Sequence, residues 1–299
     1  MSGTEWLRQQ ELYRLVCRPA LPKDTPDVIG LTRTIWSGED YVPYVWADWL
    51  SDPQGLLAVA EYGGKVIGLS KLTRQSDRQW WLEGLRVHPA YEGRRVASHL
   101  HDYLLDIWQR TGAGVIRLAT ASFRIPVHHL AERTGFHEVG EVTSFSADLV
   151  HDPIPHSFNM VTITEIHKGE DFISHSPLFH LTHGLIDIGW QWVSPENDFL
   201  VRAIQREQAW WWRDRAGLLI FREDEEDHNK TAFIQFLACS EFDATVCLTD
   251  FRRFGNRLGC NRVGWLAPLK QGLVSLLERA GYRRDWDSSL FLFEKNIDR

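Results

Sequence analysis

The segment LEGLRVHPAYEGRRVASHL, Leu82–Leu100, joins an apolar run to an amphipathic one through a short polar turn. Trp80–His88 has the length and apolar content of a buried strand, and Arg94–Arg110 carries apolar residues at helical spacing. Gly93 lies between them, so the pattern predicts a strand, a tight turn and a helix in direct succession. The first turn of such a helix has free backbone N–H groups that attract anions. A phosphate cradle and a plain basic turn both agree with this pattern.

The segments around this turn predict a mixed α/β domain that ends near Val150. Leu56–Tyr62 and Lys65–Thr73 flank Gly63-Gly64, which is the pattern of a β-hairpin. Val115–Ala119 is typical of a buried strand. The last expected elements are a short helix at Pro126–Thr134 and a pair of strands within Phe136–Leu149.

The second half of the chain repeats a pattern of the first. LAERTGFHEV at Leu130–Val139 matches LLERAGYRRD at Leu276–Asp285, and each has an amphipathic turn, a glycine and then an aromatic residue. The position of the match within each half indicates duplication. HDPIPHSF holds two prolines and reads as a linker. We therefore predict domains at residues 1–150 and 159–299, joined by residues 151–158.

Composition limits the class of protein. The net charge of the 299 residues is -7, which argues against a nucleic-acid or membrane-surface binder. No apolar run approaches the roughly 20 residues of a membrane helix, and the N-terminal residues are too polar for a secretory signal. We therefore expect a cytoplasmic protein. The four cysteines are scattered, so neither a metal site nor a disulfide framework is expected.

The run from Leu82 to Leu100, followed by VIRLATASFRIPVHHLAERTGF, resembles the Gcn5-related N-acetyltransferase (GNAT) superfamily over most of residues 10–150. Together with YVPYVWADWLSDPQ it resembles, more narrowly, the histidine N-acetyltransferase-like group. The resemblance implies tandem GNAT folds, the second of them degenerate. It also implies acetyl-CoA as co-substrate and direct transfer of its acetyl group to the amine of a small molecule, with an amino acid among the candidate acceptors.

The resemblance assigns the strand ending in LRVHP to the pantetheine arm and the following turn to the pyrophosphate. The implied coenzyme-binding residues are Leu85, Arg86, Val87, Glu92, Gly93, Arg94, Arg95, Val96, Ala97 and Ser98. Glu92 stands where the family signature has Arg or Gln, and Arg95 stands where it has a central Gly. We expect Arg95 to be helical without strain. Arg94 and Arg95 either supply charge to the phosphates or point to solvent.

Transfer to an amine requires a base near the thioester carbonyl. Glu83 is the candidate, because strand alternation places it on the same face as Leu85 and Val87. The structural alternative pairs Glu83 with Arg86 or Arg117. Gly84 is a candidate bulge that turns a backbone N–H toward the thioester oxygen.

The general acid is left open by the sequence. The family often has a tyrosine where this chain has Ala131. The other candidate donors are His128, His129, Tyr103, Ser122 and a water molecule.

The resemblance places the acceptor pocket after the first helix. Trp36, Glu39 and Tyr41 are its candidate residues, near Asp40 and Tyr44. Acidic and aromatic side chains together suit a cationic acceptor, although a surface turn packed by aromatics has the same composition.

The second half lacks the loop signature in LTDFRRFGNRLGC, Leu248–Cys260, where we expect its cradle. We therefore expect a copy of the fold without acetyl-CoA binding. It either closes the acceptor pocket with Trp190, Trp192 or Trp210–Trp212, or serves for docking or for a homodimer. Two alternative functions stay open, a non-catalytic binding protein and an enzyme that uses another acyl-CoA.

Overall fold

The computed structural model describes residues 15–33, 35–196, 198–226 and 228–297. Two compact units divide the chain. Unit 1 contains the described residues up to Ala119, Pro126–His137 and the residues from Phe293 onward. Unit 2 contains Thr120–Ile125 and Glu138–Leu292.

Unit 1 is a mixed sheet covered on both faces by helices. In the sheet the strands follow the order β1 (Leu15–Pro19), β2 (Leu56–Tyr62), β3 (Lys65–Arg74), β4 (Gln79–Val87), β5 (Gly114–Ala121) and β15 (Leu290–Ile297). The first four pair antiparallel, and β5 runs parallel to β4. The helices and 3-10 turns are η1 (Pro22–Asp24), α2 (Thr25–Thr32), η2 (Trp36–Gly38), α3 (Val42–Ser51), η3 (Pro89–Tyr91), α4 (Val96–Thr111) and α5 (Ile125–Arg133).

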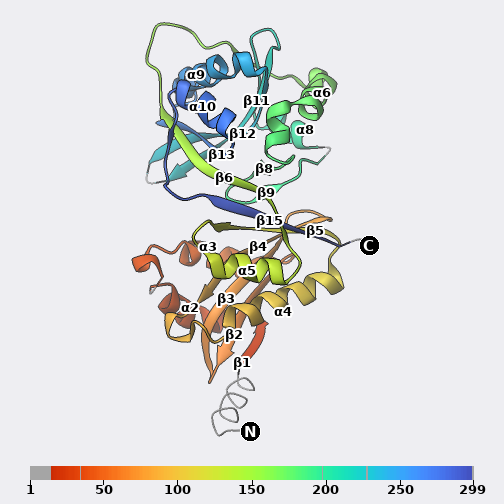
Figure 1. The fold of residues 1–299 in the computed structure, drawn as a ribbon, viewed down its shortest axis with the longest axis vertical. Helices are drawn as coiled ribbons and strands as arrows, with labels where there is room; N and C mark the ends of the chain where they lie inside the picture. Colours follow the sequence, from red (N-terminus) through yellow and green to blue (C-terminus); the bar gives the residue numbers. More distant parts are fainter. Residues whose placement is uncertain (1–14, 34, 197, 227, 298–299) are drawn as a thin grey trace. The chain divides into compact units, whose positions relative to one another are not determined.

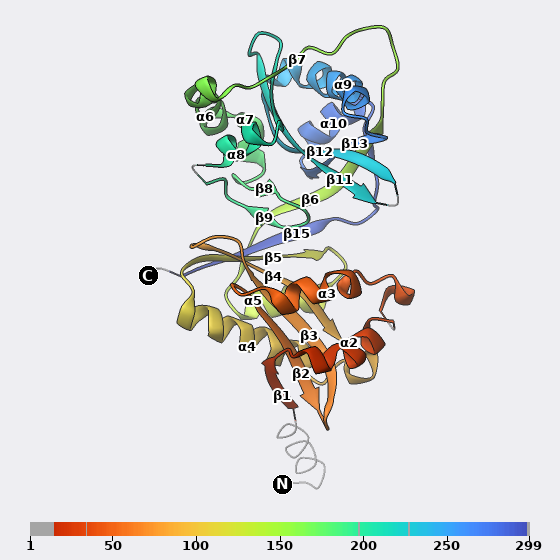
Figure 2. The ribbon, with the colours of Figure 1, turned by 180° about the vertical axis from the view of Figure 1, so that it is seen from behind.

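The two helix layers of unit 1 pack on opposite faces of its sheet. α4 and α5 lie in front of the sheet in Figure 1, and α2 and α3 lie in front of it in Figure 2. α4 packs closely on Gly68 of β3. A Cβ atom on this glycine would lie 3.1 Å from the side chain of Leu100 and 3.2 Å from that of Val96. On the other face, Leu69 packs in a buried cluster with Leu31 of α2 and Trp46 of α3. The sheet therefore presents two chemically separate faces.

Unit 2 repeats this topology. In its sheet the strands follow the order β7 (Phe158–Met160), β10 (Ala209–Trp212), β11 (Gly217–Glu226), β12 (Asn229–Cys239), β13 (Arg262–Pro268) and β6 (His137–Asp148). The first four again pair antiparallel, and β13 runs parallel to β12. Gly135 after α5 and Gly281 after α10 both have a φ of +84°. The duplication that the sequence predicts is confirmed.

The helices of unit 2 and two small pairings complete its elements. The helices and 3-10 turns are η4 (Ile163–Glu165), α6 (Ile166–His175), α7 (Pro177–Leu181), α8 (Phe199–Gln205), α9 (Glu241–Arg257) and α10 (Gln271–Arg279). β8 (Ile186–Asp187) pairs with β9 (Trp192–Val193), and β14 (Arg283–Arg284) pairs with β6. The predicted position of the corresponding cradle, Leu248–Cys260, is wrong. Most of that segment lies inside α9.

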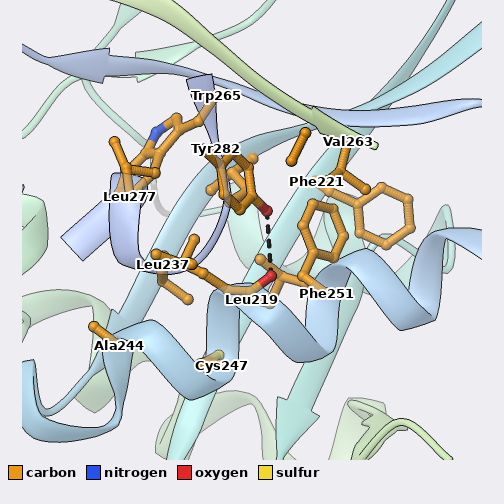
Figure 3. Packing of buried hydrophobic residues seen from close by; sticks show 14 of the residues in the cluster. Leu219, Phe221, Leu237, Ala244, Cys247, Phe251, Val263, Trp265, Leu277 and Tyr282 are labelled. Carbon is orange, nitrogen blue, oxygen red and sulfur yellow. Dashed lines mark hydrogen bonds between the residues drawn. The ribbon is translucent and has the colours of Figure 1, made fainter. Parts of the chain in front are cut away.

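The tryptophan-rich strand β10 fills the cores of unit 2. Trp210 and Trp212 belong to the cluster that includes α9 and α10, part of which Figure 3 shows, whereas Trp211 belongs to the cluster on the other face. This split follows from the alternation of side chains along a strand. All three are buried, and so is Trp192. These four are not available to wall an acceptor pocket, and only Trp190 of the expected set is exposed.

Most of the last strand of each repeat belongs to the other unit. β6 follows α5 of unit 1 in the chain but pairs with β13, and Phe293–Ile297 of β15 belongs to unit 1, where β15 lies next to β5. The expected pair of strands within Phe136–Leu149 is one continuous strand. Gly140 lies inside this strand. The division at residues 150 and 158 stays a prediction.

Candidate active site

A β-bulge at Gly84 is the central feature of unit 1. Leu69 pairs with Arg86 and Lys71 pairs with Glu83, so Gly84 and Leu85 both lie opposite the single residue between them on β3. Gly84 has a φ of +65°, a conformation that glycine adopts without strain. A Cβ atom on Gly84 would also lie 2.5 Å from the ring of Trp49. The predicted bulge is confirmed, and both the backbone and the packing require glycine.

The bulge changes the face to which Glu83 points. Directly opposed residues of an antiparallel pair share a face, so Glu83 lies with Lys71, and Arg86 lies with Leu69. Val87 pairs with Gly68 and lies on the opposite face, toward α4. The expectation that Glu83 and Val87 share a face is therefore wrong, because the extra residue inverts the alternation between them.

Glu83 is half-buried and accepts a hydrogen bond from the hydroxyl of Thr73 at 2.5 Å. The two arginines considered as its structural partners bind other carboxylates. Arg86 binds Asp40, and Arg117 binds Glu294 at 2.8 Å. Glu83 is also the first residue of β4 beyond its parallel pairing with β5, which ends at Leu82 and Leu118. A strand edge without a partner strand offers backbone groups to an extended ligand.

The side chains around Arg86 form what we call the acceptor cluster, namely Trp36, Asp40, Tyr41, Glu83 and Arg86. Nε of Arg86 donates to Asp40 Oδ2 at 2.8 Å, and Nη2 donates to Oδ1 at 3.0 Å. The guanidinium lies 4.2 Å from the ring centroid of Trp36 and 5.3 Å from that of Tyr41. The predicted acceptor residues Trp36 and Tyr41 are thus held together by a buried ion pair, whereas Glu39 is exposed.

Tyr41 connects this cluster to the candidate base. Desolvation raises the pKa of Tyr41 to about 12; the charges of Glu83 and Asp40 act in the same direction, and that of Arg86 opposes them. The ring of Tyr41 also meets Trp49 edge to face, with centroids 6.0 Å apart. Tyr41 therefore keeps its proton at neutral pH and remains a hydrogen-bond donor beside Glu83.

The N-terminus of α4 is the candidate anion site. Glu92, Gly93, Arg94 and Arg95 are exposed in the turn that precedes it, and the helix has neither a side-chain cap nor an acidic residue in its first turn. Val96 is buried, and Ala97 and Ser98 are half-buried. Because first-turn N–H groups have no partner within a helix, this end of α4 fits a phosphate group.

Arg95 has a left-handed backbone, with φ +63° and ψ +16°, directly before α4. The expectation that Arg95 is helical without strain is therefore wrong. In this conformation the Cβ atom of an L-residue approaches its own backbone, which costs about 1–2 kcal/mol. The family signature has glycine at this place, and the positive φ supplies the physical reason. Arg94 lies over the ring of Tyr91, with its guanidinium carbon 5.4 Å from the centroid.

The other predicted coenzyme residues lie on β4. Leu85 belongs to the bulge, and Leu85 and Val87 are half-buried. The guanidinium of Arg86 is held by Asp40, so the assignment of Arg86 to the coenzyme rests on its backbone alone. Taken together, the edge of β4 beyond Leu82 and the uncapped start of α4 fit the extended arm and the pyrophosphate of a coenzyme A thioester.

The candidates for a general acid are scattered. Ala131 is fully buried and has no group that donates a proton. The pKa of Tyr103 is raised by desolvation and by Cys17 of β1, which puts Tyr103 near the β1 edge of the sheet. Ser122 belongs to unit 2, whereas the ring of His128 packs on Phe293, with centroids 5.5 Å apart. The donor stays open, with His128 and His129 on α5 within unit 1.

The equivalent place in unit 2 is built differently. β12 ends at Cys239 and α9 begins at Glu241, so only Ser240 separates them. The hydroxyl of Ser240 caps the helix by accepting from the N–H of Asp243, and the first turn carries two carboxylates, Glu241 and Asp243. A capped and acidic helix start disfavours an anion. The parallel pairing of β12 with β13 ends at Ile234, so Gln235 occupies the place that Glu83 occupies in β4.

Sequence reasoning missed the roles of Asp40, Trp49 and Thr73. The sequence places Asp40 only near the pocket, whereas in the structure it is the ion-pair partner of Arg86. The signal in the sequence was an acidic residue within an aromatic segment. Charged residues are rarely buried without a partner, so this pattern indicates an ion pair. Trp49 and Thr73 are brought to the site by packing and cross-strand pairing, for which a single sequence holds no local signal.

Among the residues that the structure describes, no group of three or more His, Cys, Asp or Glu side chains is arranged to hold a metal ion. Within the same described ranges, no helix is both long and apolar enough to cross a membrane. The cytoplasmic location stays a prediction.

The chain is similar to known acetyltransferases in sequence. Residues 21–136 match the acetyltransferase (GNAT) family. The chain is 34% identical over 82 residues to histidine N-acetyltransferase of Oreochromis niloticus, covering 27% of this chain and 24% of that protein. It is 30% identical over 97 residues to probable N-acetyltransferase 16 of Homo sapiens, covering 32% of this chain and 26% of that protein. The matches thus span about a quarter of these curated relatives.

Similarity to solved structures extends over both units. A GCN5-related N-acetyltransferase from Sphaerobacter thermophilus has a TM-score of 0.63 at 14% identity, over 96% of this chain and 98% of that one. A tandem GNAT protein from the clavulanic acid biosynthesis pathway has a TM-score of 0.56 at 11% identity, over 95% and 99%. At this identity the likeness concerns the fold alone, and it confirms the predicted tandem arrangement.

Proposed function

Because the chain belongs to the GNAT superfamily, with the matching domain at residues 21–136, we propose that unit 1 is an acetyl-CoA-dependent N-acetyltransferase with a small amine as acceptor. One observation carries the proposal. The bulge at Gly84 puts Glu83 where the pairing of β4 with β5 ends, and the same strand leads to the uncapped start of α4. A base and an anion site therefore lie along one continuous segment.

Glu83 is the proposed base. Its carboxylate takes the proton from the ammonium group of the acceptor, directly or through water, and the neutral amine then attacks the thioester carbonyl. The bond from nitrogen to carbon forms, the bond from carbon to sulfur breaks, and the nitrogen releases its second proton to water while the leaving thiolate takes up one. Thr73 holds one oxygen of Glu83, which leaves the carboxylate oriented by the strand. Positioning of the two substrates contributes most of the acceleration.

Backbone groups supply the remaining chemistry. Gly84 gives the bulge its left-handed conformation, and we propose that a backbone N–H group of this segment polarises the thioester oxygen. The N–H groups at the start of α4 would hold the pyrophosphate, and Arg94 and Arg95 add positive charge beside it. The thiolate of coenzyme A is a fair leaving group at neutral pH. Its proton would come from His128 or His129 on α5, or from a water molecule.

Unit 2 is proposed to bind no acetyl-CoA. Ser240 caps the start of α9, Glu241 and Asp243 repel phosphate, and the amide of Gln235 cannot act as a base. Calorimetry with the full chain should therefore give one acetyl-CoA site per chain. Two sites would contradict this assignment.

The experiment that tests the proposed function is release of free thiol from acetyl-CoA in the presence of a panel of primary amines and amino acids. Acceptor-dependent release is expected, and calorimetry should detect coenzyme binding. No binding at millimolar acetyl-CoA would refute the proposal. The left-handed backbone of Arg95 favours a second candidate function, that of a non-catalytic binding protein with weakened affinity for the coenzyme. Longer acyl-CoA thioesters in the same assay test whether another acyl group is preferred.

A further inference from the structure

The acceptor cluster has an unbalanced charge. It contains two carboxylates, Asp40 and Glu83, and one guanidinium, Arg86. The next residue in the chain, Glu39, adds a third, exposed carboxylate. Lys71 lies opposite Glu83 on the same face, but it is buried and paired with Asp52. Within unit 1, the described residues of this cluster therefore carry net negative charge.

Arg86 is fully engaged within the cluster. Nε and Nη2 bind the two oxygens of Asp40, and the ring of Trp36 lies only 4.2 Å from the guanidinium carbon. Arg86 is 8% exposed and Asp40 is 1% exposed. A bidentate pair that is buried and packed on aromatic rings is not available to a second anion. The one cation of the acceptor cluster thus cannot serve as a carboxylate receptor.

This arrangement discriminates between two classes of acceptor. In an α-amino acid the carboxylate is attached to the carbon that bears the amine, so binding the amine beside Glu83 brings two negative groups together. Like charges placed close together act against the wrong ligand. An amine without a carboxylate has no such conflict, and its positive charge suits carboxylates and the rings of Trp36 and Tyr41. Trp36 is 47% exposed, so its ring can meet a ligand.

We propose, on the basis of the proposed function, that the acceptor is a primary amine without a carboxylate next to the reacting nitrogen. Free α-amino acids are then excluded by charge. This separates the chain from the relatives named for histidine, whose matching segments cover only about a quarter of their length.

Matched acceptor pairs test this inference with the full chain and acetyl-CoA. Histamine and histidine share the imidazole and the primary amine and differ by the carboxylate, and tryptamine and tryptophan form a second pair. Histidine methyl ester keeps the bulk of the carboxyl group but removes its charge. kcat/KM is measured by thiol release across a pH series and expressed per deprotonated amine, because the carboxylate also changes the pKa of the amine.

The expected kcat/KM is at least about tenfold higher for histamine and tryptamine than for histidine and tryptophan, with the ester close to histamine. Equal or higher kcat/KM for the amino acids overturns the inference while leaving the acetyltransferase activity established. An ester as poor as histidine also overturns it, because exclusion would then be steric. If no acceptor of either class releases thiol, the proposed function fails, and this inference fails with it.

Discussion

The carboxylate of Asp40 and the guanidinium of Arg86 form a buried, two-pronged ion pair that fastens the segment before α3 to the bulged strand β4. Asp40 also accepts from the N–H of Val42 at 3.2 Å, so the same carboxylate holds the beginning of α3. The pair thereby links the aromatic side of the acceptor cluster to the strand that carries Glu83.

Removing Asp40 should destabilise the protein strongly. Asp40→Ala leaves the Arg86 guanidinium buried without its partner, which should lower the free energy of unfolding by about 3–5 kcal/mol. Urea denaturation followed by tryptophan fluorescence measures this. Asp77→Ala is the matched control, because Asp77 is exposed in its pair with Arg74 and should cost less than about 1 kcal/mol. A loss no larger for Asp40→Ala than for Asp77→Ala would contradict the role of the pair.

Arg95→Gly should not destabilise the protein. Relief of the left-handed backbone contributes about 1–2 kcal/mol, and the greater freedom of glycine in the unfolded chain costs about 0.5–1 kcal/mol. The net change is therefore between zero and a gain of about 1.5 kcal/mol. Arg94→Gly is the control, since Arg94 does not have a positive φ and should lose about 0.5–1 kcal/mol. The urea midpoints of the two variants test whether the Arg95 backbone is strained. Equal losses of stability in both variants would mean that it is not.

Glu83→Gln should lower kcat by at least about 100-fold with the best acceptor, because the amide cannot accept the proton. The rise of the rate with pH should flatten, while acetyl-CoA affinity measured by calorimetry stays unchanged. Glu132→Gln on the exposed side of α5 removes the same charge and should leave the rate alone. Unchanged kinetics in Glu83→Gln would remove this residue from the chemistry.

Acid should weaken unit 1 through His101. Burial lowers the pKa of His101 to about 4, against an ordinary value of 6.5, so the folded protein keeps this ring neutral. As the pH falls from about 6.5 to 4, His101 becomes protonated in the unfolded chain but stays neutral in the folded protein. The free energy of unfolding therefore decreases by up to about 1.4 kcal/mol per pH unit. Above pH 6.5 the ring is neutral in both states and has no effect.

The measurement for His101 is the free energy of unfolding across this pH range. In His101→Gln the slope of the free energy of unfolding against pH should decrease by the equivalent of about one bound proton. His99 is exposed on the same helix, so His99→Gln should keep the wild-type slope. A slope that does not change in His101→Gln would show that the buried ring is not the group that titrates.

The strand, turn and helix around Leu82–Leu100 could be predicted because each has a local signal. Apolar runs mark the strand, helical spacing marks α4, and Gly93 marks the turn. The repeated Leu-x-Glu-Arg-x-Gly-aromatic pattern predicted the duplication in the same way, since Gly135 and Gly281 both require a positive φ after a helix. Local propensity is enough for features that are set within a few residues.

Features set by one inserted residue or by distant partners could not be predicted. The bulge at Gly84 was expected, yet its effect on the face of Glu83 was not, because one extra residue inverts every side chain beyond it. The left-handed Arg95 is imposed by the geometry of the turn, which the helical spacing of its neighbours does not reveal. The places of β6 and β15 depend on which sheet edge each strand meets, and a single sequence does not specify that.

The strand exchange has a consequence for synthesis on the ribosome. Proteins generally fold domain by domain as they emerge, beginning with the N-terminal one. Here Phe293–Ile297, which belong to unit 1, are translated after the whole of unit 2. Until then Arg117 lacks Glu294, and the edge of β5 lacks β15. The candidate catalytic unit is therefore the first to be translated and the last to be completed, so a stalled or shortened nascent chain holds an open sheet edge for chaperones to recognise.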